Sequence, residues 1–201
     1  MNLKNIDLKP PYKLNVGCGR KAMSDWVNLD STDLDGVDII CDLENLKENP
    51  IDLPDGSVNE FLLSHVIEHI NNSLGLMEEL WRLATDDAVA QIYVPYGSSD
   101  NAWEDQTHVR PYFMGSFSYF SQPYYWHADY GYGGDWQPVK IQLRVNKRRC
   151  QGLSMEEIKE KISIERNIVR EMVCELRAVK PKREAKRELI RQPQVFIQLV
   201  D

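Results

Sequence analysis

Two short stretches near the start of the chain carry the residue types of a nucleoside site. Residues 12–19 read Tyr-Lys-Leu-Asn-Val-Gly-Cys-Gly, an apolar run that ends in Gly-x-Gly. This pattern predicts a buried strand with a sharp turn at its carboxyl end, where the missing Cβ lets a ligand approach the backbone. Residues 26–30 read Trp-Val-Asn-Leu-Asp, and the part from Val27 predicts a second short strand that ends in Asp30. Because a carboxylate at that position accepts hydrogen bonds from ribose hydroxyls, we predict a site for a ligand that contains a nucleoside.

The spacing of these stretches differs from the dinucleotide-binding fingerprint. No third glycine follows Gly19, and Asp30 follows Gly19 by only 11 residues. The connection is too short for a full helix whose N-terminus could hold a pyrophosphate. We therefore expect a nucleoside ligand without a pyrophosphate, and a plain tight turn that binds nothing is the alternative.

The residues His65-Val66-Ile67-Glu68-His69 match the His-x-x-Glu-His pattern of one group of zinc peptidases. On a helix, the two histidines would share one face and could bind a metal together. The pattern follows a predicted buried strand directly, however, and Asn71-Asn72 interrupts the segment soon afterwards. No third ligand is evident on a downstream helix, so we predict no metal site and keep the zinc site as the alternative.

Size and composition indicate one ordinary globular domain. The chain has 201 residues, of which 42% are hydrophobic, and a net charge of −7 that argues against general nucleic-acid binding. The four cysteines show no CxxC spacing, and no apolar run reaches the length of a membrane span. Without a recognisable signal peptide, the expectation is a cytoplasmic protein with reduced thiols that does not bind membranes.

Predicted strands alternate with helices or short connections over most of the chain. This order is typical of an α/β protein with a mostly parallel sheet. A helix is predicted around Leu74 to Ala84, and the strands are predicted at 12–16, 27–30, 37–43, 58–64, 88–95 and 139–145.

The C-terminal third is predicted to contain one long helix and a closing strand. Ser154 and Glu157 have the spacing of a capping box, and apolar residues recur along a heptad-like stripe from Met155 to Val179. The predicted 154–180 helix ends before Pro181. We expect it to pack on its own sheet, with a homodimer contact as the alternative. Residues 194–200 predict the last strand.

The segment between the fifth and sixth predicted strands is rich in aromatic residues. It holds 11 of the 19 aromatics of the chain, counted from Tyr112 to Trp136. A substrate-covering lid and a loop-rich flank of the core explain this composition equally well. Within the segment, His108 is a candidate general base, with a loop-ordering hydrogen bond as its alternative role, and Arg110 and Tyr112 are candidate substrate contacts.

A basic run lies between the predicted long helix and the last strand. It extends from Lys180 to Arg191 and is diluted by Glu184 and Glu188. We interpret it as a solvated face, and a nucleic-acid partner is the less favoured alternative.

Several of these motifs together resemble class I S-adenosylmethionine-dependent methyltransferases, in particular the compact bacterial and phage type. The resemblance covers residues 12–96 and implies a seven-stranded, Rossmann-like sheet whose last strand inserts antiparallel beside the fifth. It also implies S-adenosylmethionine as the cofactor. The cofactor-binding residues that it implies are Asn15, Val16, Gly17, Cys18, Gly19, Asp30, Asp42, Leu43, Ser64 and His65.

The single domain is expected to have three parts. Residues 12–96 would bind the cofactor, residues 97–137 would form the aromatic lid, and residues 138–201 would supply the C-terminal strands and the long helix. One departure from the family is Asn15, which stands where the family has an acid. The leading hypothesis is methyl transfer to a small-molecule or sugar-like acceptor, with a non-catalytic nucleoside-binding protein and a nucleic-acid-modifying enzyme as the alternatives.

Overall fold

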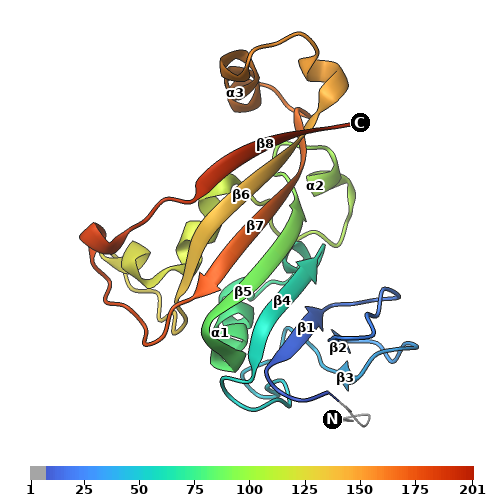
Figure 1. Ribbon diagram of the computed structural model, residues 1–201, viewed down its shortest axis with the longest axis vertical. Coiled ribbons are helices and arrows are strands. Elements are labelled where there is room, and N and C mark those ends of the chain that lie inside the picture. Colours follow the sequence, from blue (N-terminus) through green and yellow to red (C-terminus); the bar gives the residue numbers. More distant parts are fainter. Residues whose placement is uncertain (1–7) are drawn as a thin grey trace.

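The computed structural model describes residues 8–201, and these fold around one eight-stranded sheet (Figure 1). The strand order is β3-β2-β1-β4-β5-β7-β6-β8. All neighbouring strands pair in parallel except β7, which runs antiparallel to both β5 and β6. The bounds are β1 Tyr12–Val16, β2 Val27–Asp30, β3 Ile39–Ile40, β4 Val58–Ser64, β5 Ala84–Pro95, β6 Trp136–Asn146, β7 Val169–Ala178 and β8 Gln194–Val200.

The helices of the described residues are short. The α-helices are α1 Ser73–Leu83, α2 Asn101–Glu104 and α3 Met155–Ile164. The 3-10 helices are η1 Ile67–His69, η2 Met114–Phe120, η3 Gln122–Tyr125, η4 Lys147–Cys150 and η5 Arg187–Leu189. Figure 1 shows α1 behind the sheet, with the aromatic segment on the same side, and α3 beyond the end of β6.

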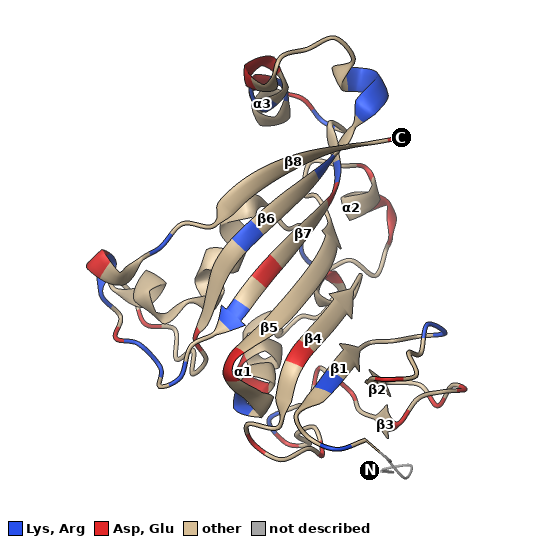
Figure 2. Cartoon of the chain, in the orientation of Figure 1, with Lys and Arg blue, Asp and Glu red and all other residues tan. Residues whose placement is uncertain are grey.

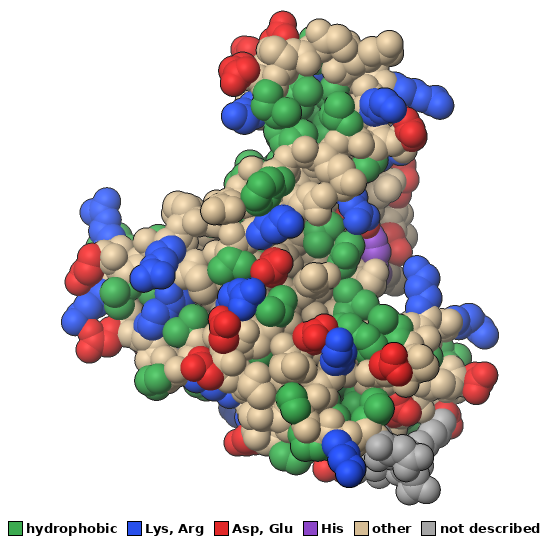
Figure 3. All heavy atoms as spheres, viewed as in Figure 1, with side chains coloured by type: hydrophobic (Ala, Val, Ile, Leu, Met, Phe, Trp, Pro, Cys, Tyr) green, Lys and Arg blue, Asp and Glu red, His purple; other side chains and the backbone are tan. Residues whose placement is uncertain are grey.

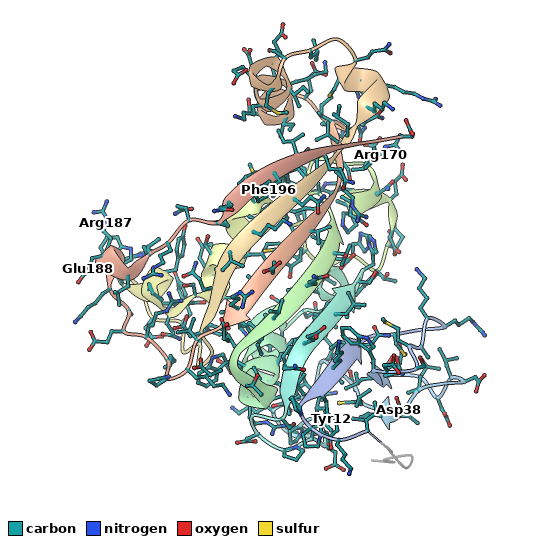
Figure 4. The ribbon with its side chains drawn as sticks, viewed as in Figure 1. Tyr12, Asp38, Arg170, Arg187, Glu188 and Phe196 are labelled. Atoms are coloured by element: carbon teal, nitrogen blue, oxygen red, sulfur yellow. The ribbon has the colours of Figure 1, made fainter. Side chains whose placement is uncertain are left out.

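Among residues 8–201, helices cover only one face of the sheet. In β7 the side chains of Met172, Cys174 and Leu176 are buried, whereas the intervening ones are partly exposed. The same alternation occurs in β5 and β6, so the three strands share one core face. Figure 2 colours charged positions on the front strands β4, β6 and β7. Lys140 Nζ lies 5.2 Å from the ring centre of Phe196, which is labelled on β8 in Figure 4.

The predicted 154–180 helix is wrong beyond Ile164. The capping box is confirmed, since Ser154 accepts from the amide of Glu157 and the Glu157 carboxylate accepts from the amide of Ser154. The helix α3 then ends, Asn167 turns the chain with a φ of 60°, and β7 begins at Val169. Positions 172 and 176 fit a helical spacing of four, but Cys174 and Ala178 are buried with them, and that period of two is the period of a strand.

This correction changes which strand runs antiparallel. We expected residues 194–200 beside the fifth strand, but β7 takes that place and pairs Ile92 with Cys174. The strand at 194–200 exists as β8, and it extends the sheet as an eighth strand parallel to β6.

The aromatic segment supplies much of the core behind the sheet. Phe61 of β4 meets Trp136 edge to face with ring centroids 5.6 Å apart, and Trp136 Nε1 donates to the carbonyl of Met77 in α1. Packing is therefore a role of this segment. The buried aromatic side chains are Tyr112, Phe117, Phe120, Tyr125, Tyr132 and Trp136, whereas Phe113, Tyr119, Trp126 and Tyr130 are exposed.

Candidate functional site

The glycine turn and Asp30 lie side by side at the carboxyl edge of the sheet. β1 pairs in parallel with β2 and β4, so the ends of the three strands meet there. The amide of Gly19 donates to Asp30 Oδ2 at 2.8 Å, and the amide of Thr32 donates to Asp30 Oδ1 at 3.0 Å. The structure thus places the predicted glycine turn and Asp30 in direct contact.

The two glycines have different surroundings. Both have positive φ, 64° at Gly17 and 51° at Gly19. A Cβ on Gly17 would lie 2.6 Å from Cγ2 of Val66, so this glycine makes room for the chain that follows β4. A Cβ on Gly19 would have no atom within 4 Å. The open space for a ligand therefore lies at Gly19, beside the Asp30 carboxylate.

Asn15 and Cys18 lie on either side of Gly17 and are both buried. The buried Asn15 amide donates to the carbonyl of Lys21 and to Asn28 Oδ1, both at 3.1 Å. Burial raises the pKa of the Cys18 thiol, with the Asp30 carboxylate as a second cause, so the thiol stays neutral. The two Asn15 hydrogen bonds thus join the end of β1 to the loop at Lys21 and to Asn28 of β2.

The remaining predicted cofactor residues lie at the ends of three strands. Val16 is fully buried at the end of β1, and Leu43 is buried just after β3. Asp42 is exposed, and its carboxylate accepts from the side-chain amide of Asn45 at 2.6 Å. Ser64 ends β4 half-buried.

His65 follows β4 in a left-handed backbone conformation, with a φ of 57°. Its Nε2 lies 2.8 Å from Glu171 Oε1 and its Nδ1 lies 3.3 Å from Glu68 Oε1. Glu171, followed by Glu68, raises the pKa of His65 to about 9, so the ring is a cation at neutral pH. Arg144 pairs with the other oxygen of Glu171.

A cavity of about 340 Å³ adjoins His65. Arg144, Arg170 and Glu171 are among the residues that line it. Arg170 is labelled in Figure 4, near the C-terminus. Figure 3 shows the molecule indented on this edge, with a histidine side chain in view between the lobe that carries α3 and the lower part of the sheet.

The three predicted acceptor-side residues have unequal environments. The His108 side chain is almost buried, its ring meets that of His69 at a centroid distance of 4.7 Å, and its Nδ1 lies 3.2 Å from the carbonyl oxygen of Ala102. The loop-ordering hydrogen bond considered for His108 is therefore present. Arg110 is exposed. Tyr112 is buried, and its hydroxyl donates to the carbonyl of Ile67 at 3.3 Å, so the structure shows it in a packing role.

Glu171 and Arg144, which flank His65, were not predicted as site residues from the sequence. Both lie in the antiparallel pair of β6 and β7, where they occupy opposite positions in the register. Residue 171 fell inside the predicted helix, which concealed its position at the edge of the sheet. The alternation of buried residues at 172, 174, 176 and 178 was the available signal.

No protein-family model matches the chain, and no curated protein sequence is similar to it. Solved structures are similar to it in fold. A SAM-dependent methyltransferase from Archaeoglobus fulgidus matches with a TM-score of 0.58 and 18% identity, over 82% of this chain and 84% of that one. An S-adenosylmethionine-dependent methyltransferase from Mesorhizobium loti matches with a TM-score of 0.51 and 11% identity, over 84% and 91% of the two chains. The fold is therefore the Rossmann-like methyltransferase fold that the sequence motifs implied.

Within residues 8–201, none of the helices combines the length and the apolar character needed to cross a lipid bilayer.

Proposed function

We propose that this protein transfers a methyl group from S-adenosylmethionine to a small-molecule or sugar-like acceptor. One observation carries the proposal: the Asp30 carboxylate lies beside the Gly19 backbone, with open space at Gly19, at the carboxyl edge of a sheet with methyltransferase topology. Ligands of open α/β sheets bind at this edge.

The residues present fit this cofactor. Gly17 to Gly19 would hold the methionine part with their backbone, Asn15 and Val16 would position that turn, and the Asp30 carboxylate would accept from the ribose hydroxyls. When bound, S-adenosylmethionine supplies a methyl group on a sulfonium, which leaves by in-line displacement. The adenine would lie beside Asp42 and Leu43, with Ser64 and His65 on the floor of the site.

The loop that follows α2 would bind the methyl acceptor. If the Nδ1 proton of His108 is donated to the Ala102 carbonyl, Nε2 is left to accept a proton from the acceptor. The cationic His65 has no free lone pair at neutral pH and is not a base. Arg110 is exposed and can pair with an anionic group of the acceptor, and Tyr112 holds the loop by packing.

Asp30→Asn tests the proposal because it keeps the size of the side chain and removes its charge. We expect the affinity for S-adenosylmethionine, measured by calorimetry, to fall about tenfold or more, since hydrogen bonds to a charged group contribute about 1.5–3 kcal/mol each. Asp35→Asn is the matched control, because Asp35 is exposed in the loop after β2. Equal affinities in Asp30→Asn and Asp35→Asn, or no binding by the folded wild-type protein, would reject the site.

A non-catalytic protein that binds a nucleoside is the second candidate. Asn15 favours it, because this residue lends no charge to the cofactor and its amide is engaged by Lys21 and Asn28. A screen of small-molecule and sugar-like acceptors with methyl-labelled S-adenosylmethionine separates the two. Labelled product supports the enzyme, and cofactor binding without product across the screen supports the second candidate.

A further inference from the structure

Three potential metal ligands from distant parts of the chain meet beside η1. Glu68, His69 and His108 each offer one ligand atom, and these atoms lie within 4.8 Å of one another. The loop that carries His108 is attached to η1 by the amide of Val109, which donates to the carbonyl of Glu68 at 2.9 Å. The two segments are thus held together by the backbone, independently of the three side chains.

The Glu68 carboxylate is buried and has one ion-pair partner but no hydrogen bond among the described residues. The residue is 2% exposed, and neither carboxylate oxygen has a hydrogen bond within residues 8–201. Its closest charged neighbour is His65, whose Nδ1 lies 3.3 Å from Oε1 and whose Nε2 is directed to Glu171. A buried carboxylate without hydrogen bonds is costly, so a further cation at this position would offset its desolvation.

Both histidines have the hydrogen bonds that orient metal ligands. Thr107 Oγ1 lies 2.6 Å from Asp105 Oδ1, so the hydroxyl gives its proton to that carboxylate and can accept from His69 Nδ1 at 2.9 Å. His108 Nδ1 lies 3.2 Å from the Ala102 carbonyl oxygen and can only donate to it. In each ring the Nδ1 proton is then donated, which leaves Nε2 with a free lone pair. Metal-ligating histidines are oriented in this way.

We propose that Glu68, His69 and His108 form a binding site for a divalent transition cation, with Zn²⁺ as the ion that fits the donors. Two imidazole nitrogens and one carboxylate are a ligand set of catalytic zinc sites, whereas Mg²⁺ prefers oxygen ligands. Ligand atoms around a tetrahedral zinc are about 3.4 Å apart, so small side-chain rotations would close the observed cluster around the ion.

The site is not the one that the His-x-x-Glu-His pattern suggests. His65 is not one of the three ligands: its Nε2 faces Glu171, and its Nδ1 lies beside Glu68 Oε1 at 3.3 Å as the ion-pair partner of that carboxylate. The third ligand is His108, which comes from the loop after α2. Metal binding does not rest on the proposed methyl transfer, but His108 Nε2 cannot serve as a base while it binds the ion. In the loaded protein, an acceptor oxygen bound to the cation would therefore be activated by the metal.

Calorimetric titration of chelator-stripped protein with ZnCl₂ tests the site, in buffer free of S-adenosylmethionine. We expect one Zn²⁺ per chain and no comparable binding of Mg²⁺. His69→Ala and His108→Ala should each weaken the affinity for Zn²⁺ by about 100-fold or more, because each removes a ligand. His127→Ala should leave it unchanged, since His127 is an exposed histidine outside the cluster. Glu68→Gln, which keeps the shape of the side chain, should weaken it as well.

Circular dichroism shows whether each variant is folded. If His69→Ala is unfolded, the comparison of Glu68→Gln and His108→Ala with the wild type still tests the site. The proposal is overturned if the wild-type protein binds no stoichiometric Zn²⁺. It is also overturned if folded Glu68→Gln and His108→Ala still bind Zn²⁺ with wild-type affinity, or if His127→Ala loses binding to the same extent. Because no cofactor is in the titration, this result is independent of the Asp30→Asn experiment.

Discussion

Gly17 and Gly19 share a left-handed backbone but serve different neighbours. At Gly17 the neighbour is Val66, a stiff β-branched side chain with two methyl groups within 3.0 Å of an added Cβ. At Gly19 the space is open, and the backbone amide is used by Asp30. One glycine is therefore needed for packing, and the other keeps the proposed cofactor site accessible.

Alanine substitutions should separate these two roles. Gly17→Ala should lower the free energy of unfolding by about 3 kcal/mol, from the left-handed backbone and the clash with Val66 together. Gly19→Ala should lower it by only about 1–2 kcal/mol, and should weaken S-adenosylmethionine binding beyond what its stability change explains. Urea unfolding and calorimetry measure the two effects.

Val66→Ala in the Gly17→Ala background is the control, because it removes the methyl groups that an added Cβ would meet. It should recover part of the lost stability. If Gly17→Ala and Gly19→Ala are equally destabilising, the packing role assigned to Gly17 is wrong.

At the scale of elements, an arginine anchors the connection between β7 and β8. Asp135, just before β6, is fully buried, and its carboxylate accepts from Arg183 Nη2 at 2.7 Å and from Nε at 2.8 Å. Arg183 Nη1 also donates to Gln137 at 2.8 Å, and the amide of Gln122 donates to Asp135 at 3.1 Å. One residue of the basic run thus joins three segments of the chain.

Arg183→Ala should lower the free energy of unfolding by about 3–5 kcal/mol, because it leaves the Asp135 charge buried without its ion-pair partner. Urea unfolding followed by circular dichroism measures this. Lys182→Ala is the control, since Lys182 is exposed, and it should change stability by no more than about 0.5 kcal/mol. A loss below about 1 kcal/mol in Arg183→Ala would show that water replaces the arginine.

At the scale of the whole molecule, the basic run is part of the fold. Lys180 Nζ lies 4.8 Å from the centre of a Trp81 ring, and the Arg187 guanidinium lies 5.4 Å from a ring centre of Trp126. Lys186 pairs with Glu184. With the net charge of −7, these contacts argue against a surface built to follow a phosphate backbone.

We therefore predict that the protein does not bind single-stranded RNA at about 0.15 M salt. Fluorescence anisotropy of a labelled oligonucleotide, titrated with protein, measures this. Binding that weakens steeply with added salt and is lost when Lys182 and Arg191 are replaced by alanine would favour the nucleic-acid-modifying alternative.

The local elements near the N-terminus could be predicted because each depends on a few neighbouring residues. An apolar run that ends in Gly-x-Gly can turn only where the chain lacks a Cβ, and Asp30 follows within one short connection. The predicted bounds of the first four strands differ from the observed ones by at most three residues at either end, since their apolar runs are bounded by turn residues. The fifth strand begins four residues earlier than predicted, at Ala84. The long helix was wrong because spacing by four residues is common to a helix and to one face of a strand.

The sequence by itself thus determined the glycine turn, the acid next to it and the parallel direction of the first strands. Only the tertiary structure decided that residues 169–178 form the antiparallel strand, that Glu171 and Arg144 flank His65, and that His108 meets Glu68 and His69. Each of these contacts joins residues far apart in the chain, and the pairing of β7 between β5 and β6 depends on the free energy of the whole sheet, which no local spacing records.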